Sequence, residues 1–288
     1  MRYIARATLS GRPPIMPFKR TLRTLCLAVS TGALAALAQA APRSVYLEEL
    51  TSVEVRDAIA AHALTTVIIP VGGTEQNGAH MTLGKHNVRA KVLAGRIAAQ
   101  LGNALVAPVV AYVPEGRIAP PAAHMRYAGT ISIPDAVFEA LLEAAAQSFR
   151  QHGFRDVVLI GDHGGYQSDL AAVAARLNRE WAATPVRAHY IADYYRATQT
   201  TYLQALRAHG LSEAQIGSHA GAADTALALA VDPDLVKTDR MPRDLHDAAA
   251  VGVNGDPRAA SAALGQSGVD AIVAQSVAAI RKATGAAR

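Results

Sequence analysis

The sequence predicts an α/β fold whose central sheet is mainly parallel and covered by helices on both faces. Short apolar, β-branched runs alternate with helical segments of about 15 residues, which is typical of repeated βα units. These runs lack apolar–polar alternation, as expected for strands buried on both faces. Two of them end in glycine and are followed at once by acidic residues and histidine, as at the carboxyl edge of an open sheet.

The first half of the chain is expected to alternate helix and strand twice. The expected elements are a helix at 52–62 capped by Thr51 or Ser52, a strand at 65–71, a helix at 86–101 ended by Gly102-Asn103, and a strand at 104–113. A loop rich in Pro, Gly and Ala follows at 114–128. The glycine-rich loop at 72–85 separates the first strand from the second helix.

The second half repeats the alternation. The expected elements are an extended piece at 130–133, a helix from Pro134-Asp135 to Gln151, a strand at 156–161, a helix at 167–182, a strand at 186–191, a partly helical stretch at 192–210, a helix at 224–231, and one or two helices at 260–283 around Gly265 to Gly268. No internal repeat or low-complexity linker follows residue 45. We therefore expect a single α/β domain over residues 41–288.

Residues 1–40 are typical of a secretory signal peptide. Lys19, Arg20 and Arg23 form a basic region, 25–37 is apolar, and Ala38-Gln39-Ala40 is a small-x-small cleavage site. A membrane anchor is the alternative, but about 13 apolar residues fall short of the roughly 20 that span a bilayer. Met16 is an alternative start, which would make 1–15 a mis-assigned extension. We expect a periplasmic or secreted protein with no membrane attachment after cleavage.

The positive net charge of the chain belongs to this leader. Residues 1–40 contain six basic residues and no acidic one, so removing them from the net charge of +5 leaves −1 for the remainder. A nearly neutral body offers no basic surface for nucleic acid. The charge therefore argues against a nucleic-acid partner.

The cysteine content limits the chemistry of any metal site. The chain has one cysteine, Cys26, and it lies in the apolar part of the leader. The mature chain therefore has no thiolate ligand and no disulfide. A metal would have to be bound by His, Asp, Glu or Asn.

Three separated clusters carry such residues. Glu75, Asn77, His80 and His86 follow the strand at 65–71 across a glycine-rich loop, Asp162 and His163 follow the strand at 156–161, and His219 and Asp224 flank a run of Ala and Gly. Because parallel strands end at one edge of a sheet, we expect a single site assembled from these clusters. His124, in the loop at 114–128, is a candidate for substrate contact.

Each of these residues also has a structural alternative. Glu75 and His86 are placed to cap helix ends or face solvent, and Asp224 falls at a helix start, where Asp is a common cap that stabilises by roughly 1 kcal/mol. His163 is equally a candidate for a hydrogen bond to loop backbone, and His124 for a solvent-facing position. These alternatives stay open on the residues alone.

The chain resembles the creatininase (creatinine amidohydrolase) family in several segments. Segment 74–86, TEQNGAHMTLGKH, resembles the family pattern E-Q-H-G-x-H-L-P-x-x-x-D, and 162–165, DHGG, resembles G-H-G-G-N. Segment 124–132, HMRYAGTIS, is similar to H-x-x-F-P-G-T-I-S, and 219–225, HAGAADT, to H-A-G-x-x-E-T. Segment 252–257, GVNGDP, matches G-V-x-G-D-P. The motifs follow the family order from about residue 45 to 284.

The resemblance implies a three-layer α/β/α sandwich, commonly oligomeric, with one or two divalent metal ions. It implies hydrolysis of a carbon–nitrogen amide bond, often in a small cyclic substrate. By motif position, Glu75, His163 and Asp224 are metal ligands, Asp224 standing where the family has Glu. His86 stands at the position of a bridging Asp, and Asn77 at that of a ligand His.

These two substitutions favour one ion over two. Replacing a bridging carboxylate by imidazole removes a negative charge and the oxygen pair that holds two cations together. Asn77 offers only an amide oxygen. The expected site is therefore a single Zn²⁺, with Mn²⁺ as the alternative, held by Glu75, His86, His163 and Asp224.

The sequence thus predicts a metal-dependent hydrolase of an amide bond in a small molecule, in which metal-activated water attacks the carbonyl. His219 is the candidate for proton transfer to the leaving nitrogen, and Asp162 for orienting a metal ligand. The alternative is a catalytically inactive periplasmic binding or assembly protein that keeps the fold. Asn77 and His86 are the residues that favour that alternative.

Overall fold

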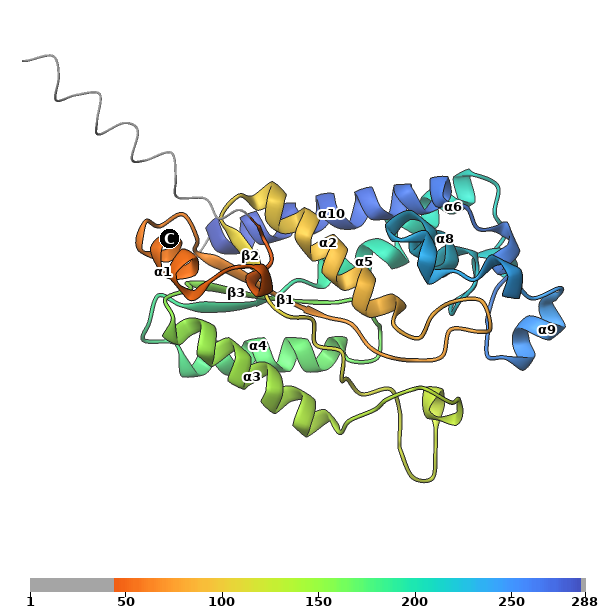
Figure 1. Ribbon diagram of the computed structural model, residues 1–288, viewed down its shortest axis with the longest axis horizontal. Helices are drawn as coiled ribbons and strands as arrows, with labels where there is room; N and C mark the ends of the chain where they lie inside the picture. Colours follow the sequence, from red (N-terminus) through yellow and green to blue (C-terminus); the bar gives the residue numbers. More distant parts are fainter. Residues whose placement is uncertain (1–43, 286–288) are drawn as a thin grey trace, which may run out of the picture. The chain divides into compact units, whose positions relative to one another are not determined.

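Helices cover both faces of a four-stranded sheet in the computed structural model, which describes residues 44–285 (Figure 1). The strands are β1 (Thr66–Val71), β2 (Ala104–Val106), β3 (Asp156–Gly161) and β4 (Arg187–Tyr190). Their order is β2-β1-β3-β4, and all three pairings are parallel. The predicted α/β class with a parallel sheet is confirmed. The predicted signal peptide, 1–40, lies outside the described residues.

Helices lie on each face of the sheet, and others lie beyond its end. The helices of the described residues are α1 (Ser52–Ala60), α2 (Lys85–Leu101), α3 (Asp135–Gln151), α4 (Gln167–Glu180), α5 (Ala192–Gln199), α6 (Thr201–Ala208), α7 (Glu213–Ile216), α8 (Ala222–Val231), α9 (Leu245–Ala250) and α10 (Ala262–Gly285). Figure 1 shows α2, α5 and α10 over one face and α3 and α4 over the other. Within residues 44–285, no helix combines the length and the apolarity needed to cross a membrane.

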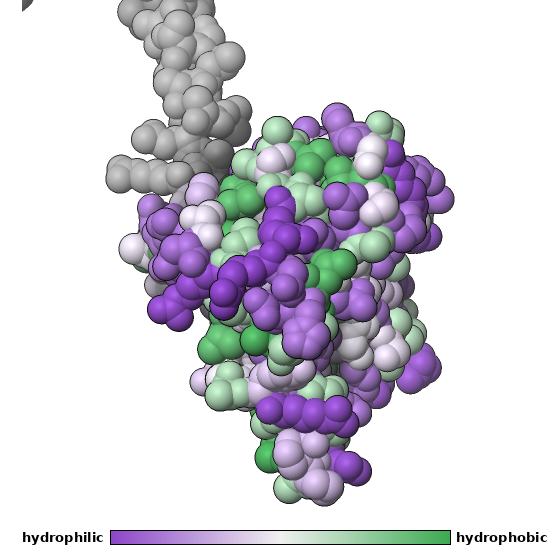
Figure 2. Space-filling model, turned by 90° about the vertical axis from the view of Figure 1, so that its right-hand side faces the viewer, coloured by the Kyte–Doolittle hydropathy of each residue, from purple (hydrophilic) through white to green (hydrophobic). Residues whose placement is uncertain are grey.

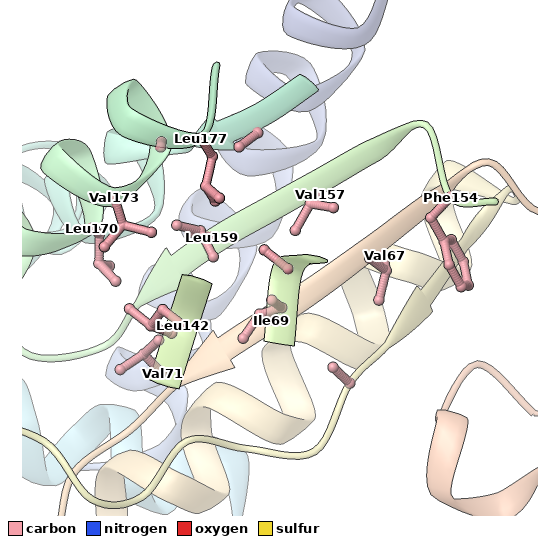
Figure 3. Packing of buried hydrophobic residues seen from close by; sticks show 14 of the residues in the cluster. Val67, Ile69, Val71, Leu142, Phe154, Val157, Leu159, Leu170, Val173 and Leu177 are labelled. Carbon is pink, nitrogen blue, oxygen red and sulfur yellow. The ribbon is translucent and has the colours of Figure 1, made fainter. Parts of the chain in front are cut away.

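The uninterrupted apolar runs of β1 and β3 follow from burial on both faces. Alternate side chains of a strand point to opposite faces. Val67 and Ile69 of β1 therefore pack with Leu142 of α3 and Val173 of α4 (Figure 3), while Ile68 packs in a second core with residues of α2 and α10. Because both faces are covered, neither set of positions tolerates polar residues.

The second strand is shorter than its prediction of 104–113. Regular pairing ends after Val106, and Pro108, which has no N–H to donate, follows two residues later. The segment nevertheless stays beside β1, because the Val110 N–H donates to the carbonyl of Pro70 over 3.0 Å and the Gly72 N–H donates to the Val110 carbonyl over 2.9 Å. The chain beyond β2 is thus held against the end of β1.

Local signals set several helix ends as expected. Thr51 caps α1 in a capping box with Glu54, and α2 ends at Gly102, whose φ of +80° is left-handed. The C-terminal segment forms one helix, α10, rather than two. Gly265 lies within this helix without breaking it. A Cβ at this position would overlap the carbonyl oxygen of Ala226, so the missing side chain lets α10 pack closely on α8.

The strand order creates a natural site between β1 and β3. The chain leaves β1 through α2 toward β2 on one side, and β3 pairs with β1 on the other side. The chain continues from β1 into α2 on one face of the sheet and from β3 into α4 on the other face (Figure 1). Open α/β sheets bind ligands at such a point, outside the carboxyl ends of the strands. The loops after Val71 and Gly161 meet there.

Candidate metal centre

Segments distant in the sequence meet beyond the carboxyl ends of β1 and β3. Glu75 follows β1, His86 lies in the first turn of α2, and Asp162 with His163 follows β3. A cavity of about 250 Å³ is lined by His86, Asp162 and His163 together with residues of α5, α6 and α8. Seen from the side where α8 and α9 lie, the surface is largely hydrophilic with hydrophobic residues between (Figure 2). A second, apolar cavity of about 420 Å³ lies between α3 and the chain after β2.

The loop after β1 presents Glu75 through specific backbone contacts. Gly73 has a φ of +148°, and its N–H donates to Asn87 Oδ1 over 2.9 Å. A Cβ at Gly73 would lie 2.5 Å from Glu115 Oε1, so the glycine leaves room for that carboxylate. The Glu75 N–H donates to the Leu83 carbonyl over 3.2 Å. This brings Glu75 to face the loop that carries Glu115.

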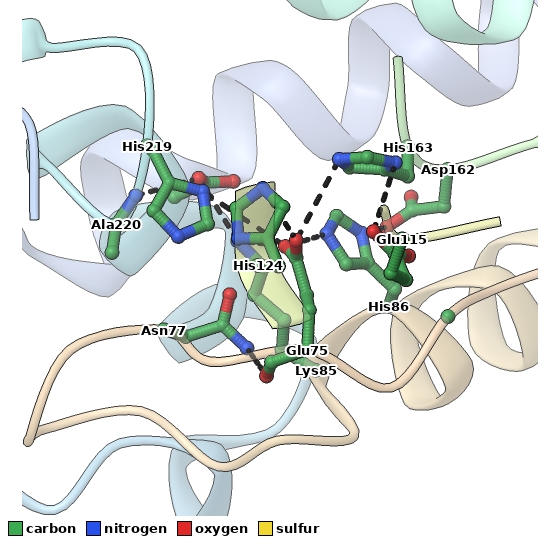
Figure 4. Close-up of polar contacts among 12 residues, drawn as sticks. Glu75, Asn77, Lys85, His86, Glu115, His124, Asp162, His163, His219 and Ala220 are labelled. Atoms are coloured by element: carbon green, nitrogen blue, oxygen red, sulfur yellow. Dashed lines mark hydrogen bonds and ion pairs between the residues drawn. The ribbon is translucent and has the colours of Figure 1, made fainter. Parts of the chain in front are cut away.

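Four side chains in this region have the arrangement of a metal-binding group. One potential ligand atom from each of Glu75, Glu115, His124 and His163 lies within 4.8 Å of the others. Glu75 Oε2 is 3.1 Å from His124 Nε2 and 3.6 Å from His163 Nε2, and His163 Nδ1 is 3.6 Å from Glu115 Oε2 (Figure 4). Two carboxylates and two imidazoles form a donor set suited to Zn²⁺.

Several atoms of this group are buried without partners. Among the described residues, Glu75 Oε2, both carboxyl oxygens of Glu115 and His124 Nδ1 have no hydrogen-bond partner. Burial and the negative charge of Glu75 raise the pKa of Glu115 to about 9. A buried pair of carboxylates is unfavourable without a cation, and a divalent ion would satisfy these atoms. The residues present therefore fit a metal ion.

His163 is neutral in this environment. Burial outweighs the opposing effect of the Glu75 charge and lowers its pKa to about 3. The backbone N–H of His163 donates over 3.0 Å to the hydroxyl of Tyr166, which in turn donates to the carbonyl of Val71 over 2.9 Å. These bonds fix the backbone of His163 at the end of β1 and β3. A neutral imidazole is the form that binds a metal.

His86, predicted as a ligand, lies outside the group of four. Its Nε2 is 2.8 Å from Glu75 Oε1 and its Nδ1 is 2.6 Å from Asp162 Oδ2. The ring therefore bridges two buried carboxylates, as Figure 4 shows, and neither nitrogen is free for an ion. Asp162 contacts His86 and not a member of the group, so its predicted role of orienting a metal ligand stays a prediction.

Asp224 is also outside the group, because other partners hold both of its oxygens. Lys85 Nζ lies 3.0 Å from Oδ2 and Arg89 Nη1 lies 2.9 Å from Oδ1. Oδ2 also accepts the N–H of Ala220 over 2.9 Å. Asp224 lies in the first turn of α8, where Gly221 is the N-cap residue and no side chain caps the helix.

Asn77 points its amide at the loop backbone. Its Nδ2 donates to the carbonyls of Glu75 over 2.9 Å and Thr82 over 3.1 Å. Nδ2 thus supports the loop after β1, while Oδ1, the atom predicted as a weak ligand, is buried without a hydrogen-bond partner. His86 and Asp224 are the two predicted ligands whose ligand atoms are held by other partners, whereas Glu75 and His163 belong to the group.

His219 lies at the edge of the group with a basic nitrogen toward it. Its Nε2 is 3.0 Å from the carbonyl oxygen of Gln76, which can only accept, so we assign the ring proton to Nε2. The Gln76 amide, also 3.0 Å from Nε2, has another acceptor in the carbonyl of Gly252. Nδ1 is then unprotonated and 3.9 Å from Glu75 Oε1. Burial and the Lys85 charge lower the pKa of His219 to about 4.

Glu115 is the member of the group that the sequence interpretation missed, and His124 was assigned to substrate rather than to the metal. A signal for Glu115 was present, since it is the one carboxylate between residues 104 and 134 and follows the segment predicted as a strand. It was overlooked because it matches none of the quoted family motifs. His124 belongs to η3 (Ala123–Arg126), directly after Ala123, whose φ of +50° is unusual for a residue other than glycine.

Comparisons with known proteins agree with this architecture. The sequence model of the creatininase family, described as creatinine amidohydrolase, matches residues 48–280. The mycofactocin precursor peptide peptidase of Mycolicibacterium smegmatis is 30% identical over 221 residues, covering 69% of this chain and 78% of that protein. The creatinine amidohydrolase of Pseudomonas putida is 27% identical over 204 residues, covering 69% and 76%.

A solved structure gives the same result. A structure described as creatininase with Mn superposes with a TM-score of 0.67 at 25% identity, covering 84% of this chain and 99% of that one. The names of the two sequence relatives denote hydrolytic enzymes. Since the family match spans most of the sequence and the described fold agrees with it, the protein belongs to the creatininase family.

Proposed function

We propose that this protein is a metal-dependent hydrolase that cleaves a carbon–nitrogen amide bond in a small molecule. The observation that carries the proposal is the group of open, buried ligand atoms on Glu75, Glu115, His124 and His163 beside a cavity. The relatives support the reaction class, since an amidohydrolase and a peptidase both cleave amide bonds. The cavity of about 250 Å³ favours a small substrate.

The four residues would hold a single Zn²⁺ or Mn²⁺ ion. Two imidazole nitrogens and two carboxylate oxygens suit Zn²⁺, and the Mn-containing relative keeps Mn²⁺ as an alternative. When bound, the ion supplies Lewis acidity that makes a carbonyl carbon more electrophilic and a water molecule more acidic. This assignment replaces His86, Asp224 and Asn77 with Glu115 and His124 as ligands.

His219 would move the proton that the reaction requires. The carbonyl of Gln76 fixes the tautomer, so Nδ1 accepts a proton from the attacking water and delivers it to the leaving nitrogen. Gln76 acts through His219 and is therefore a positioning residue. The neutral ring at neutral pH has the form needed to accept that proton.

The test is metal-dependent turnover by the purified mature protein. The protein is loaded with Zn²⁺ or Mn²⁺, its metal content is measured, and a panel of linear and cyclic small amides is screened for hydrolysis. Glu75→Gln and Glu115→Gln are expected to lose bound metal and turnover together. Absence of a stoichiometric ion after loading would contradict the proposal.

A binding or assembly role without catalysis is the second candidate. It is favoured by Asn77 and His86, which stand at family ligand positions and make internal contacts instead. In that case the wild type binds members of the amide panel without converting them, and Glu75→Gln leaves binding unchanged. Turnover that disappears in Glu75→Gln would exclude this candidate.

A further inference from the structure

The N-terminal turn of α2 carries three buried basic residues on the face that meets the candidate site. Lys85, His86 and Arg89 are each at most 3% exposed, although Lys and Arg are rarely buried unless paired. We call them the α2 basic cluster. Their partners are the carboxylates of Glu75, Asp162 and Asp224, which come from three other segments. Glu115 makes no hydrogen bond or ion pair with the cluster among the described residues.

The contacts of the α2 basic cluster occupy specific carboxylate oxygens. Asp162 Oδ2 accepts from Arg89 Nε over 2.9 Å and Nη2 over 2.7 Å, and the ring of His86 lies against the same oxygen. Asp162 Oδ1 accepts from the Tyr194 hydroxyl over 2.9 Å. With both oxygens of Asp224 also occupied, neither aspartate has an oxygen left for an ion.

The two carboxylate oxygens of Glu75 have different surroundings. Oε1 faces His86 Nε2 at 2.8 Å and lies 3.8 Å from Lys85 Nζ. Oε2 has no hydrogen-bond partner in the described part of the chain. The open oxygen of Glu75 is therefore Oε2, on the side that faces His124 and His163.

The fixed charges point the same way. Lys85 and Arg89 are permanent cations that already face Glu75, Asp162 and Asp224. A second divalent ion would add further positive charge beside them in a buried site. The second ion would also have to approach the ammonium and guanidinium groups.

We propose that the α2 basic cluster takes the place of a second metal ion, so that the centre binds one divalent ion through Glu75, Glu115, His124 and His163. The inference rests on the metal binding in the proposed function and adds which residues limit it to one ion. Lys85 and Arg89 supply the positive charge, and the ring of His86 fills the space between Glu75 and Asp162.

The test counts ions in the purified mature protein after loading with Mn²⁺. Elemental analysis and native mass spectrometry are expected to give one ion per chain, with the isolated-ion Mn²⁺ signal in electron paramagnetic resonance. Two ions, with a spin-coupled signal, would overturn this inference and leave the proposed function standing. No ion would overturn both.

Variants identify the residue that excludes the second ion. His86→Asp removes the ring, frees Glu75 Oε1 and adds a carboxylate, so it is expected to raise the count from one ion to two. Asn77→Ala, which removes a neighbouring polar side chain without freeing that oxygen, is the matched control and should keep one. A folded His86→Asp protein that still binds one ion would refute the role of the cluster, and the wild-type count decides the matter if that variant does not fold.

Discussion

Glu75 and Glu115 are neighbouring buried carboxylates whose surroundings favour opposite protonation states. Burial alone would raise the pKa of Glu75, but the hydrogen bond with His86 and nearby positive charges outweigh it and lower the pKa. At Glu115, burial and the charge of Glu75 outweigh the opposing charge of Lys85 and raise the pKa to about 9. In the metal-free protein, Glu75 is therefore ionised at neutral pH and Glu115 keeps its proton.

Glu115 should make the metal-free protein less stable as pH rises. In the unfolded chain this carboxyl loses its proton near its ordinary pKa of 4.5, whereas the folded one holds it to about 9. Between these values the unfolded state binds fewer protons, so the free energy of unfolding falls with increasing pH. Glu115→Gln should be more stable than wild type by about 1–3 kcal/mol near pH 8, yet similar near pH 4. Urea unfolding in the presence of a chelator measures this.

Binding of the ion requires the Glu115 carboxylate, so it should release a proton at neutral pH. Calorimetry of metal binding in buffers of different ionisation enthalpy measures that release, which Glu115→Gln should lack. For the stability prediction, the free energy of unfolding of wild type and of Glu115→Gln is compared across pH. The same pH dependence in both would show that Glu115 is not the group that destabilises the protein at high pH.

His219 should affect turnover without affecting metal content. Its Nδ1 faces the group but is not part of the open ligand set, so His219→Gln is expected to lower kcat by roughly 10²–10⁴-fold. The metal content of the variant should remain that of wild type. Loss of the ion in this variant would instead identify His219 as a ligand.

Among the elements, the strand ends were the parts of the site that the sequence predicted best. Glu75 and His163 follow β1 and β3, and a buried apolar run ending in glycine marks both positions. The prediction of 156–161 for the third strand is confirmed in full. The local pattern sufficed because burial on both faces leaves an uninterrupted apolar signal.

The contacts of α2 could not be predicted in this way. Lys85 and Arg89 sit in a helix turn where such residues usually face solvent, and only the positions of Asp162 and Asp224 in space explain their burial. For the same reason His86 was assigned to the metal, although its ring is used by two carboxylates. Helical periodicity reports apolar faces and gives no signal for a buried polar face.

The contact of α8 with α10 should depend on a missing side chain. A Cβ at Gly265 would overlap the Ala226 carbonyl, and that atom belongs to backbone and cannot rotate away. Gly265→Ala is expected to destabilise the protein by roughly 1–3 kcal/mol. Gly285→Ala, in the same helix with no atom within 4 Å of the added carbon, is the matched control and should change stability by less than about 0.5 kcal/mol. Equal unfolding midpoints for the two variants would argue against close packing at Gly265.

On the scale of the whole molecule, the candidate site joins parts of the chain that are distant in sequence. The side chain of Arg89 connects α2 both to the loop after β3, through Asp162, and to α8, through Asp224. Glu115 and His124 add the long segment between β2 and α3. An ion bound to the group of four would therefore connect the loops after β1, β2 and β3.

Metal binding should accordingly raise the unfolding temperature. At a free metal concentration of about 100 Kd, binding to the folded state adds roughly 2.7 kcal/mol. That corresponds to a rise of roughly 5–10 °C for a chain of this size. Thermal unfolding followed with and without a chelator measures the shift, and Glu75→Gln should abolish it. A shift of the same size in Glu75→Gln would place the stabilising ion elsewhere.

The α2 basic cluster also bears on the order in which the protein is assembled. Because Arg89 and Lys85 already join α2 to Asp162 and Asp224, the chain has internal partners for these carboxylates before any ion arrives. Small domains whose fold depends on a structural metal stay unfolded without it. We therefore expect this chain to fold without its proposed ion, so that folding and metal binding would be separable in time.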